Sequence, residues 1–179
     1  MKAGVQCYGC DELQDKLETV YGEKIIGLPE KRSIKISEWT VTPFYLPHDN
    51  TPNFGFLIDL PSNAGRLLYA TDFEYLSYTF KSLKINYFLI ECNHQSDLVD
   101  KSEAKYEHSL RDHSELETVK EIIRVNKTPD MRNVILCHLS DSWSDPDRMK
   151  QEVQEVVGKW VTVDVAEKNS VIMLNKYPF

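Results

Sequence analysis

The sequence lacks three features that would each place it in a definite class of protein. It has no excess of positive charge, because its net charge is −7, so it offers no basic stripe to neutralise the phosphates of DNA or RNA. It has no apolar run near the roughly 20 residues that a bilayer-spanning helix needs. Its first residues, from Met1 onward, are of mixed polarity and do not read as a signal peptide. We therefore expect a cytoplasmic protein with no membrane partner.

Cysteine is also scarce, and its spacing excludes a zinc ribbon. Cys7 and Cys10 form a C-x-x-C pair, but no second pair follows, and Cys92 and Cys137 lie in apolar runs. Zinc ribbons need two such pairs at matched spacing. We expect four reduced cysteines, which agrees with a cytoplasmic location.

The length and the residue pattern predict one α/β domain over residues 1–179 with much antiparallel pairing. Apolar periodicity predicts helices over 10–21, 113–126 and 146–158, the last with Asp145 as its N-cap. The polar segment 93–112 is expected to be a long loop. Apolar or alternating runs predict strands over 33–37, 39–46, 54–60, 66–71, 86–92, 133–138, 160–166 and 170–175.

Histidine is rare as well, with five in the chain, yet metal-type ligands stand at the ends of three of these strands. His48, Asp72 and His138 each follow an apolar, β-favouring run. A carboxylate directly behind such a run is costly to bury unless it is paired or binds a cation, and His and Asp together suit zinc, manganese or iron. Each residue also has a structural explanation: a turn capped by Asp49, a helix N-cap at Asp72, and a satisfied turn histidine at His138.

A second set of polar residues follows the strand at 86–92 and precedes the helix at 113–126. Glu91 and His94 lie at the exit of that strand, and His108 and His113 flank the start of the helix. A histidine at a helix N-terminus can meet a bound phosphate, because backbone amides point there too. Solvated surface positions explain His108 and His113 equally simply.

The order of five segments resembles the metallo-β-lactamase fold. They are FYLPHDNTPNFGFLI, RLLYATDFEYL, NYFLIECNH, RDHSELETV and NVILCHLSD. Within that superfamily the sequence is most similar to the YycJ-type branch of bacterial and phage metal-dependent hydrolases. The resemblance implies an αββα sandwich, two divalent metal ions (Zn, Mn or Fe) and a phosphodiester or nucleic-acid-type substrate.

The resemblance also implies roles for individual residues. His48 and His138 would each hold one metal, and Asp72 would bridge both, so that a bridging hydroxide attacks the phosphodiester. His113 would lie near the substrate phosphate. Asp49, Glu91 and His94 would support the metal ligands or the substrate rather than bind the metals.

The sequence departs from the resemblance at one motif, because H-x-H-x-D-H is absent. The chain therefore corresponds to about the C-terminal two-thirds of such a domain, with a sandwich incomplete at its N-terminus. Three explanations fit the absence of this motif: a split or truncated gene, a gene start placed too late, and a fragment that persists without catalysis. We expect this chain alone to bind the two ions weakly and to be inactive. The alternative function is a non-catalytic assembly module, which pairs with a separate N-terminal piece or with itself through an exposed sheet edge.

Overall fold

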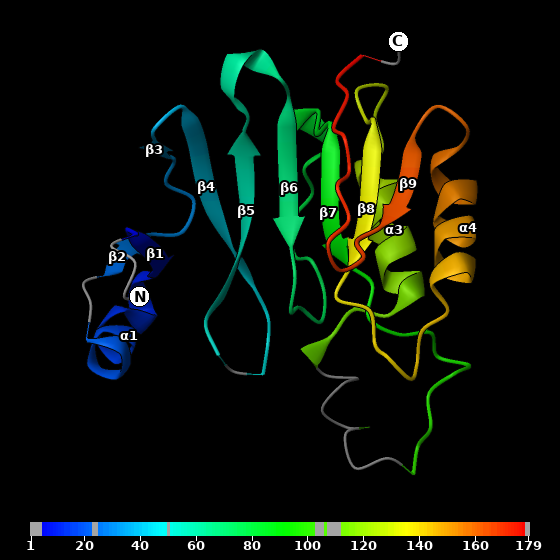
Figure 1. Cartoon of the computed structure of the whole chain (residues 1–179), viewed down its shortest axis with the longest axis horizontal. Coiled ribbons are helices and arrows are strands. Elements are labelled where there is room, and N and C mark those ends of the chain that lie inside the picture. The colour runs from blue at the N-terminus through cyan, green and yellow to red at the C-terminus, as the bar shows by residue number, and fades with distance from the viewer. Residues whose placement is uncertain (1–4, 23–24, 50, 103–105, 107–111, 178–179) are drawn as a thin grey trace.

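One seven-stranded mixed sheet organises the chain (Figure 1). The computed structural model describes residues 5–22, 25–49, 51–102, 106 and 112–177. In spatial order the strands are β3 (Ile34–Ile36), β4 (Trp39–Leu46), β5 (Asn53–Asp59), β6 (Arg66–Ala70), β7 (Tyr87–Glu91), β8 (Asn133–Cys137) and β9 (Thr162–Val165). Neighbours from β3 to β6 run antiparallel, and neighbours from β6 to β9 run parallel. The α/β class with antiparallel pairing is thus confirmed.

The parallel half of the sheet brings several strand ends together at one edge. Helix α3 (Leu116–Asn126) connects β7 to β8, and helix α4 (Pro146–Val157) connects β8 to β9. Because β6, β7 and β8 run in the same direction, the residues that follow their carboxyl ends meet at the same edge of the sheet. The fold can assemble a polar site at these carboxyl ends of the parallel strands, which are called the polar edge below.

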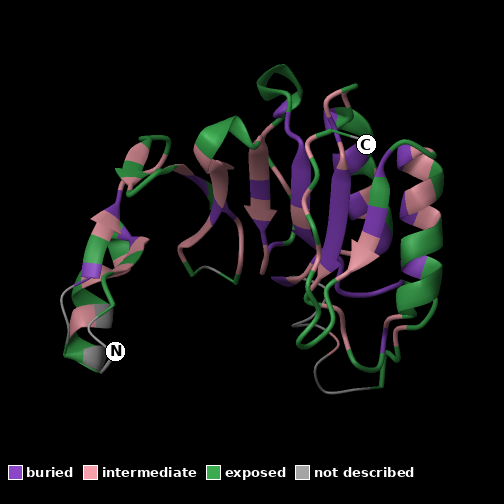
Figure 2. Cartoon of the chain, turned by 45° about the horizontal axis from the view of Figure 1, so that its top comes forward, coloured by how far each residue is buried: buried purple, intermediate pink, exposed green. Residues whose placement is uncertain are grey.

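The hydrophobic core lies between the sheet and these two helices. Phe88, Ile90, Val134 and Leu136 are fully buried, since alternate residues of β7 and β8 face the helices. Burying a side chain of this size contributes roughly 1.5–3 kcal/mol. Figure 2 shows the buried residues concentrated on these central strands. The core therefore holds rigid the strands whose ends form the polar edge.

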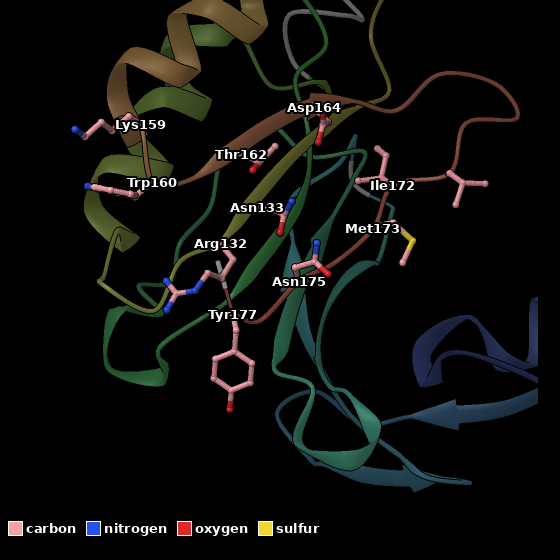
Figure 3. Close-up of a pocket in the computed structure, with 11 residues that line it drawn as sticks. Arg132, Asn133, Lys159, Trp160, Thr162, Asp164, Ile172, Met173, Asn175 and Tyr177 are labelled. Carbon is pink, nitrogen blue, oxygen red and sulfur yellow. The ribbon is translucent and has the colours of Figure 1, made fainter. Parts of the chain in front are cut away.

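The opposite face of the sheet is only partly covered. The segment after β9 turns at Asn169, which has a φ of 68°, and then crosses in front of β7 and β8 (Figure 1). A cavity of about 670 Å³ lies between this segment and β8 and β9 (Figure 3). It includes Asn133 and Thr162, the first residues of β8 and β9, so it lies at the end of the sheet opposite the polar edge.

A small N-terminal unit lies beside the β3 edge of the sheet (Figure 1). Strands β1 (Cys7–Cys10) and β2 (Ile25–Leu28) pair in parallel, and a 3₁₀ turn and helix α1 (Gln14–Tyr21) connect them. The helix ends at Gly22, whose φ of 66° suits glycine, as its position in the sequence predicts. No helix among the described ranges is long and apolar enough to cross a membrane.

Two expectations about the elements need correction. The predicted strand over 170–175 is wrong, because this segment joins no sheet. In this crossing segment Ile172 is half-buried, while its neighbours Val171 and Met173 are exposed, so its alternating burial does not come from strand pairing. The predicted helix over 113–126 begins only at Leu116, since the Glu115 side chain accepts a hydrogen bond from the Glu117 amide and caps it there. His113 therefore lies in the loop before the helix.

Candidate metal centre

Three side chains from three separate segments converge at the polar edge of the sheet. Asp72 follows β6, His113 precedes α3, and His138 follows β8. One ligand atom from each lies within 4.8 Å of the other two. The side chains of Asp72 and His138 are 43% and 45% exposed, so the group is open to solvent. Two imidazoles and one carboxylate form a donor set that suits zinc, manganese or iron.

The backbone turns sharply at two of these residues. Asp72 and His138 both have a φ of 55°, in the left-handed region that non-glycine residues rarely adopt. Asn53, at the start of β5, donates from its side-chain amide to the carbonyl oxygens of Thr71 and Asp72, at 3.0 and 2.6 Å. Strained backbone that the surroundings hold in place is a feature of functional sites. Here the left-handed conformation turns the Asp72 and His138 side chains toward each other just after β6 and β8 end.

The buried carboxylate of Glu91 contacts the group on its protein side. Glu91 is fully buried, and its Oε1 lies 2.6 Å from Nδ1 of His113 and 3.2 Å from Nδ1 of His138. Its Oε2 accepts a hydrogen bond of 3.1 Å from the amide of Phe73. A carboxylate that receives the N–H of a ligating histidine fixes its ring orientation and raises its basicity. Glu91 thus contacts two members of the group and the residue next to the third.

His48 lies beside the group but is not one of its three members. Its ring centroid is 5.6 Å from that of His113, and its Nδ1 is 3.0 Å from the carbonyl oxygen of Asp112. Because a carbonyl only accepts, Nδ1 is the donor in this contact. Among the described residues, the structure therefore groups Asp72 and His138 with His113 rather than with His48.

Asp49 and His94 are not members of the group either. Asp49 is exposed and has a φ of 33° in the turn after His48. His94 is buried, its backbone pairs with Glu115, and neither of its ring nitrogens has a hydrogen-bond partner among the described residues. The prediction about His108 falls outside the described residues.

The surroundings shift the pKa values of the two more buried histidines in opposite directions. The hydrogen bond to Glu91 raises the pKa of His113 above its usual range, with further support from the charge of Asp72. Burial lowers the pKa of His94. Burial also raises the pKa of the Cys137 thiol to about 12, so it stays protonated at neutral pH in the metal-free protein.

Three residues that position the site were not predicted from the sequence. They are Asn53, which holds the turn at Asp72; Asp112, whose carbonyl holds His48; and Ser114, whose hydroxyl donates to the carbonyl of Phe73 at 2.7 Å. The only local signal is that Asp112 and Ser114 flank His113. A polar residue next to a candidate ligand is common, so that signal is weak.

Solved structures with the metallo-β-lactamase fold are similar to this chain. The fold protein YhfI from Bacillus subtilis matches with a TM-score of 0.67 and 16% identity, over 89% of this chain and 60% of its own length. A diphosphatase of the PhnP family matches at 0.59 and 14%, over 90% of this chain and 55% of its own. CmlA, a diiron β-hydroxylase from Streptomyces venezuelae, matches at 0.58 and 13%, over 86% of this chain and 35% of its own.

These likenesses establish the fold. The chain has a mixed α/β architecture of the metallo-β-lactamase type, as the resemblance implies, and it spans about 60% of the length of YhfI. No protein-family model matches the chain, and no curated protein matches its sequence. The three structures include a diphosphatase and a hydroxylase, so the reaction must be argued from the site rather than from the fold.

The left-handed turn at Asp72 gives a testable stability difference. We expect the metal-free Asp72→Gly variant to be more stable than Asp72→Ala by about 1 kcal/mol, because only glycine adopts this conformation without a steric cost. Urea denaturation of both variants measures the difference. Thr40, an ordinary residue of β4, is the control, and there glycine should be the less stable substitution. Equal stabilities of Asp72→Gly and Asp72→Ala would show that the backbone at residue 72 is not strained.

The opposite pKa shifts predict an order of titration. In metal-free protein, proton NMR should give His113 a midpoint above 6.5 and His94 a midpoint below it. Folding stability from His113 should therefore be complete below its unfolded pKa of about 6.5 and lost as the pH rises through its raised folded pKa. Glu91→Gln should lower the His113 midpoint. A His113 midpoint at or below 6.5 in the wild type would show that the contact with Glu91 does not form.

Proposed function

We propose that this protein is a metal-dependent hydrolase that cleaves phosphate esters, with phosphodiesters as its preferred class. The observation that carries the proposal is the convergence of Asp72, His113 and His138 at the open edge of the sheet, with Glu91 buried beneath them. Ligands bind at the carboxyl edge of strands in α/β sheets because strand ends and loops present side chains there. The donor set fits a divalent cation.

Each residue of the site has a part that follows from its contacts. Asp72 supplies a negative charge at the exposed rim, while His113 and His138 supply ring nitrogens oriented by Glu91. A bound cation would polarise the phosphoryl group and acidify a water molecule. Without a cation, the raised pKa of His113 would favour its protonated form, which attracts an anionic phosphate, and a bound cation would displace that proton.

The comparisons agree with this chemistry at a coarse level. A diphosphatase of the PhnP family shares the fold, and its reaction is also cleavage at phosphate. The E-x-N-H segment, Glu91 to His94, supports placing the chain with the YycJ-type branch. The four free cysteines support action in the reducing cytoplasm.

Hydrolysis of bis-p-nitrophenyl phosphate tests the proposal. The absence of H-x-H-x-D-H predicts an inactive chain, but the three converging donors lead us to expect slow turnover with added Zn²⁺ or Mn²⁺ and none after chelation. Asp72→Asn and His138→Gln should each lower kcat/KM by at least about tenfold, since each removes a donor atom. Thr40→Ala is the matched control, because it lies away from the site on β4. Faster turnover of nitrocefin than of the phosphodiester would contradict the choice of substrate class.

A second function, that of an assembly module, is favoured by the uncovered face of the sheet. Alternate paired positions of β4, β5 and β6 point to this face, away from α3 and α4, while the positions between them, such as Phe44 and Leu68, point into the core. Its apolar side chains are half-buried or exposed, and they include Val41, Tyr45, Phe54, Phe56, Ile58 and Tyr69. Apolar side chains that stay partly accessible together on one sheet face are typical of interaction sites. A second copy of this chain could cover the face by packing sheet against sheet.

Light scattering after size-exclusion chromatography tests self-association. We expect a dimer at micromolar concentration, and we expect Phe56→Lys to shift it to monomer because the lysine places a charge in the apolar contact. Lys35→Glu, a charge change on the exposed edge strand β3, is the control. A wild-type chain that stays monomeric up to about 100 µM would contradict the assembly-module function. A dissociation constant of that size corresponds to only about −5 kcal/mol of association free energy.

A further inference from the structure

The cavity between strands β8 and β9 and the crossing segment, residues 170–177, has the size of a ligand site. Its volume of about 670 Å³ lies in the range of small-molecule pockets. No residue of the candidate metal centre lines it, so the two places are separate. We propose that this cavity binds a nucleoside monophosphate, with Arg132 and Lys159 at the phosphate and with Asn133 and Trp160 at the base.

The first support is a pair of cations that no carboxylate neutralises. Nε of Arg132 donates to the carbonyl oxygen of Lys176 at 2.8 Å, and its Nη1 donates to two carbonyls of the preceding loop at 2.6 and 2.9 Å. These contacts fix the guanidinium and leave both N–H groups of Nη2 available. Among the described residues, neither Arg132 nor Lys159 forms an ion pair. A fixed guanidinium without a carboxylate partner suits phosphate.

The second support is the buried amide of Asn133. This residue is only 6% exposed and lines the cavity. Its backbone N–H donates to the Asn86 carbonyl at 3.2 Å, but its side-chain amide has no hydrogen-bond partner in the described part of the chain. A buried amide of this kind is costly unless a partner reaches it. Asparagine pairs with the edge of adenine, because its amide donates and accepts at once.

The third support is aromatic surface at the cavity. Trp160 and Tyr177 both line it, and they are 79% and 63% exposed. Figure 3 shows that the lining residues come from three places, namely the start of β8, the start of β9 with the loop before it, and the crossing segment. An exposed ring at a cavity that also holds cations offers a stacking surface for a base.

The acidic residue of the lining does not cancel the two cations. Oδ1 of Asp164 lies 3.4 Å from Nζ of Lys150, outside the lining, so its charge already has a partner. The site is also independent of the proposed function, because binding in this cavity needs no divalent cation. Where both are correct, the cavity takes a product of nucleic-acid cleavage at the end of the sheet opposite the polar edge.

Calorimetric titration of the chelator-treated chain with AMP tests the site. We expect one AMP per chain with a dissociation constant below about 1 mM, and binding of adenosine and of inorganic phosphate at least about tenfold weaker. Trp160→Ala should weaken AMP binding by at least about fivefold, since it removes the stacking surface. Lys159→Gln should weaken it by at least about threefold. Lys35→Gln, on the exposed edge strand β3, is the matched control and should leave binding unchanged.

Several results of this titration would overturn the proposal. They are no saturation by AMP below about 1 mM, equal affinity for AMP and phosphate, equal affinity for AMP and adenosine, and unchanged binding by Trp160→Ala. Lys159 and Trp160 are both exposed, so their variants should fold, and thermal melting checks this.

A measurement on the wild type locates the bound nucleotide. In ¹⁵N-labelled protein, AMP should shift the side-chain amide of Asn133 and the backbone amide of Thr162, its paired neighbour on β9. The backbone amides of Asp72 and His138 should stay in place. Shifts confined to the polar edge would overturn the proposal. A chain that binds AMP in the cavity but does not hydrolyse the phosphodiester supports this site and removes the proposed function.

Discussion

The site depends on one buried interaction, the contact of the Glu91 carboxylate with two histidines. Glu91 is fully buried at the end of β7, where an unpaired charge would cost several kcal/mol. His113, His138 and the Phe73 amide supply its partners, and they come from three different segments. The burial of this one acid therefore requires those segments to meet. It also sets the ring orientation of both histidines before any ion arrives.

The fold makes this meeting possible through strand direction and backbone strain. Parallel β6, β7 and β8 end at one edge, and the left-handed turns at Asp72 and His138 aim both side chains along that edge. The core between the sheet and its helices holds the strands in register. The cavity of about 670 Å³ beside β8 and β9 is not lined by Asp72, His113 or His138, so its volume does not indicate where the chemistry is.

Some of this was predictable from the sequence and some was not, for physical reasons. Asp72 and His138 were predicted as ligands because a polar residue directly after an apolar strand is visible in one dimension. The place of His113 in the group was not predicted, because it depends on how the loop before α3 packs against β7. The same limit explains the wrong strand at 170–175, since alternation of apolar residues arises both in a paired strand and in a segment that crosses a sheet face.

Anomalous X-ray diffraction at the zinc edge, on crystals grown with one equivalent of Zn²⁺, tests the central claim most directly. The account predicts an anomalous peak at the polar edge that is bonded to Asp72 and His138, with Glu91 in contact with His138. No peak at the polar edge, or a peak only elsewhere on the chain, would contradict it.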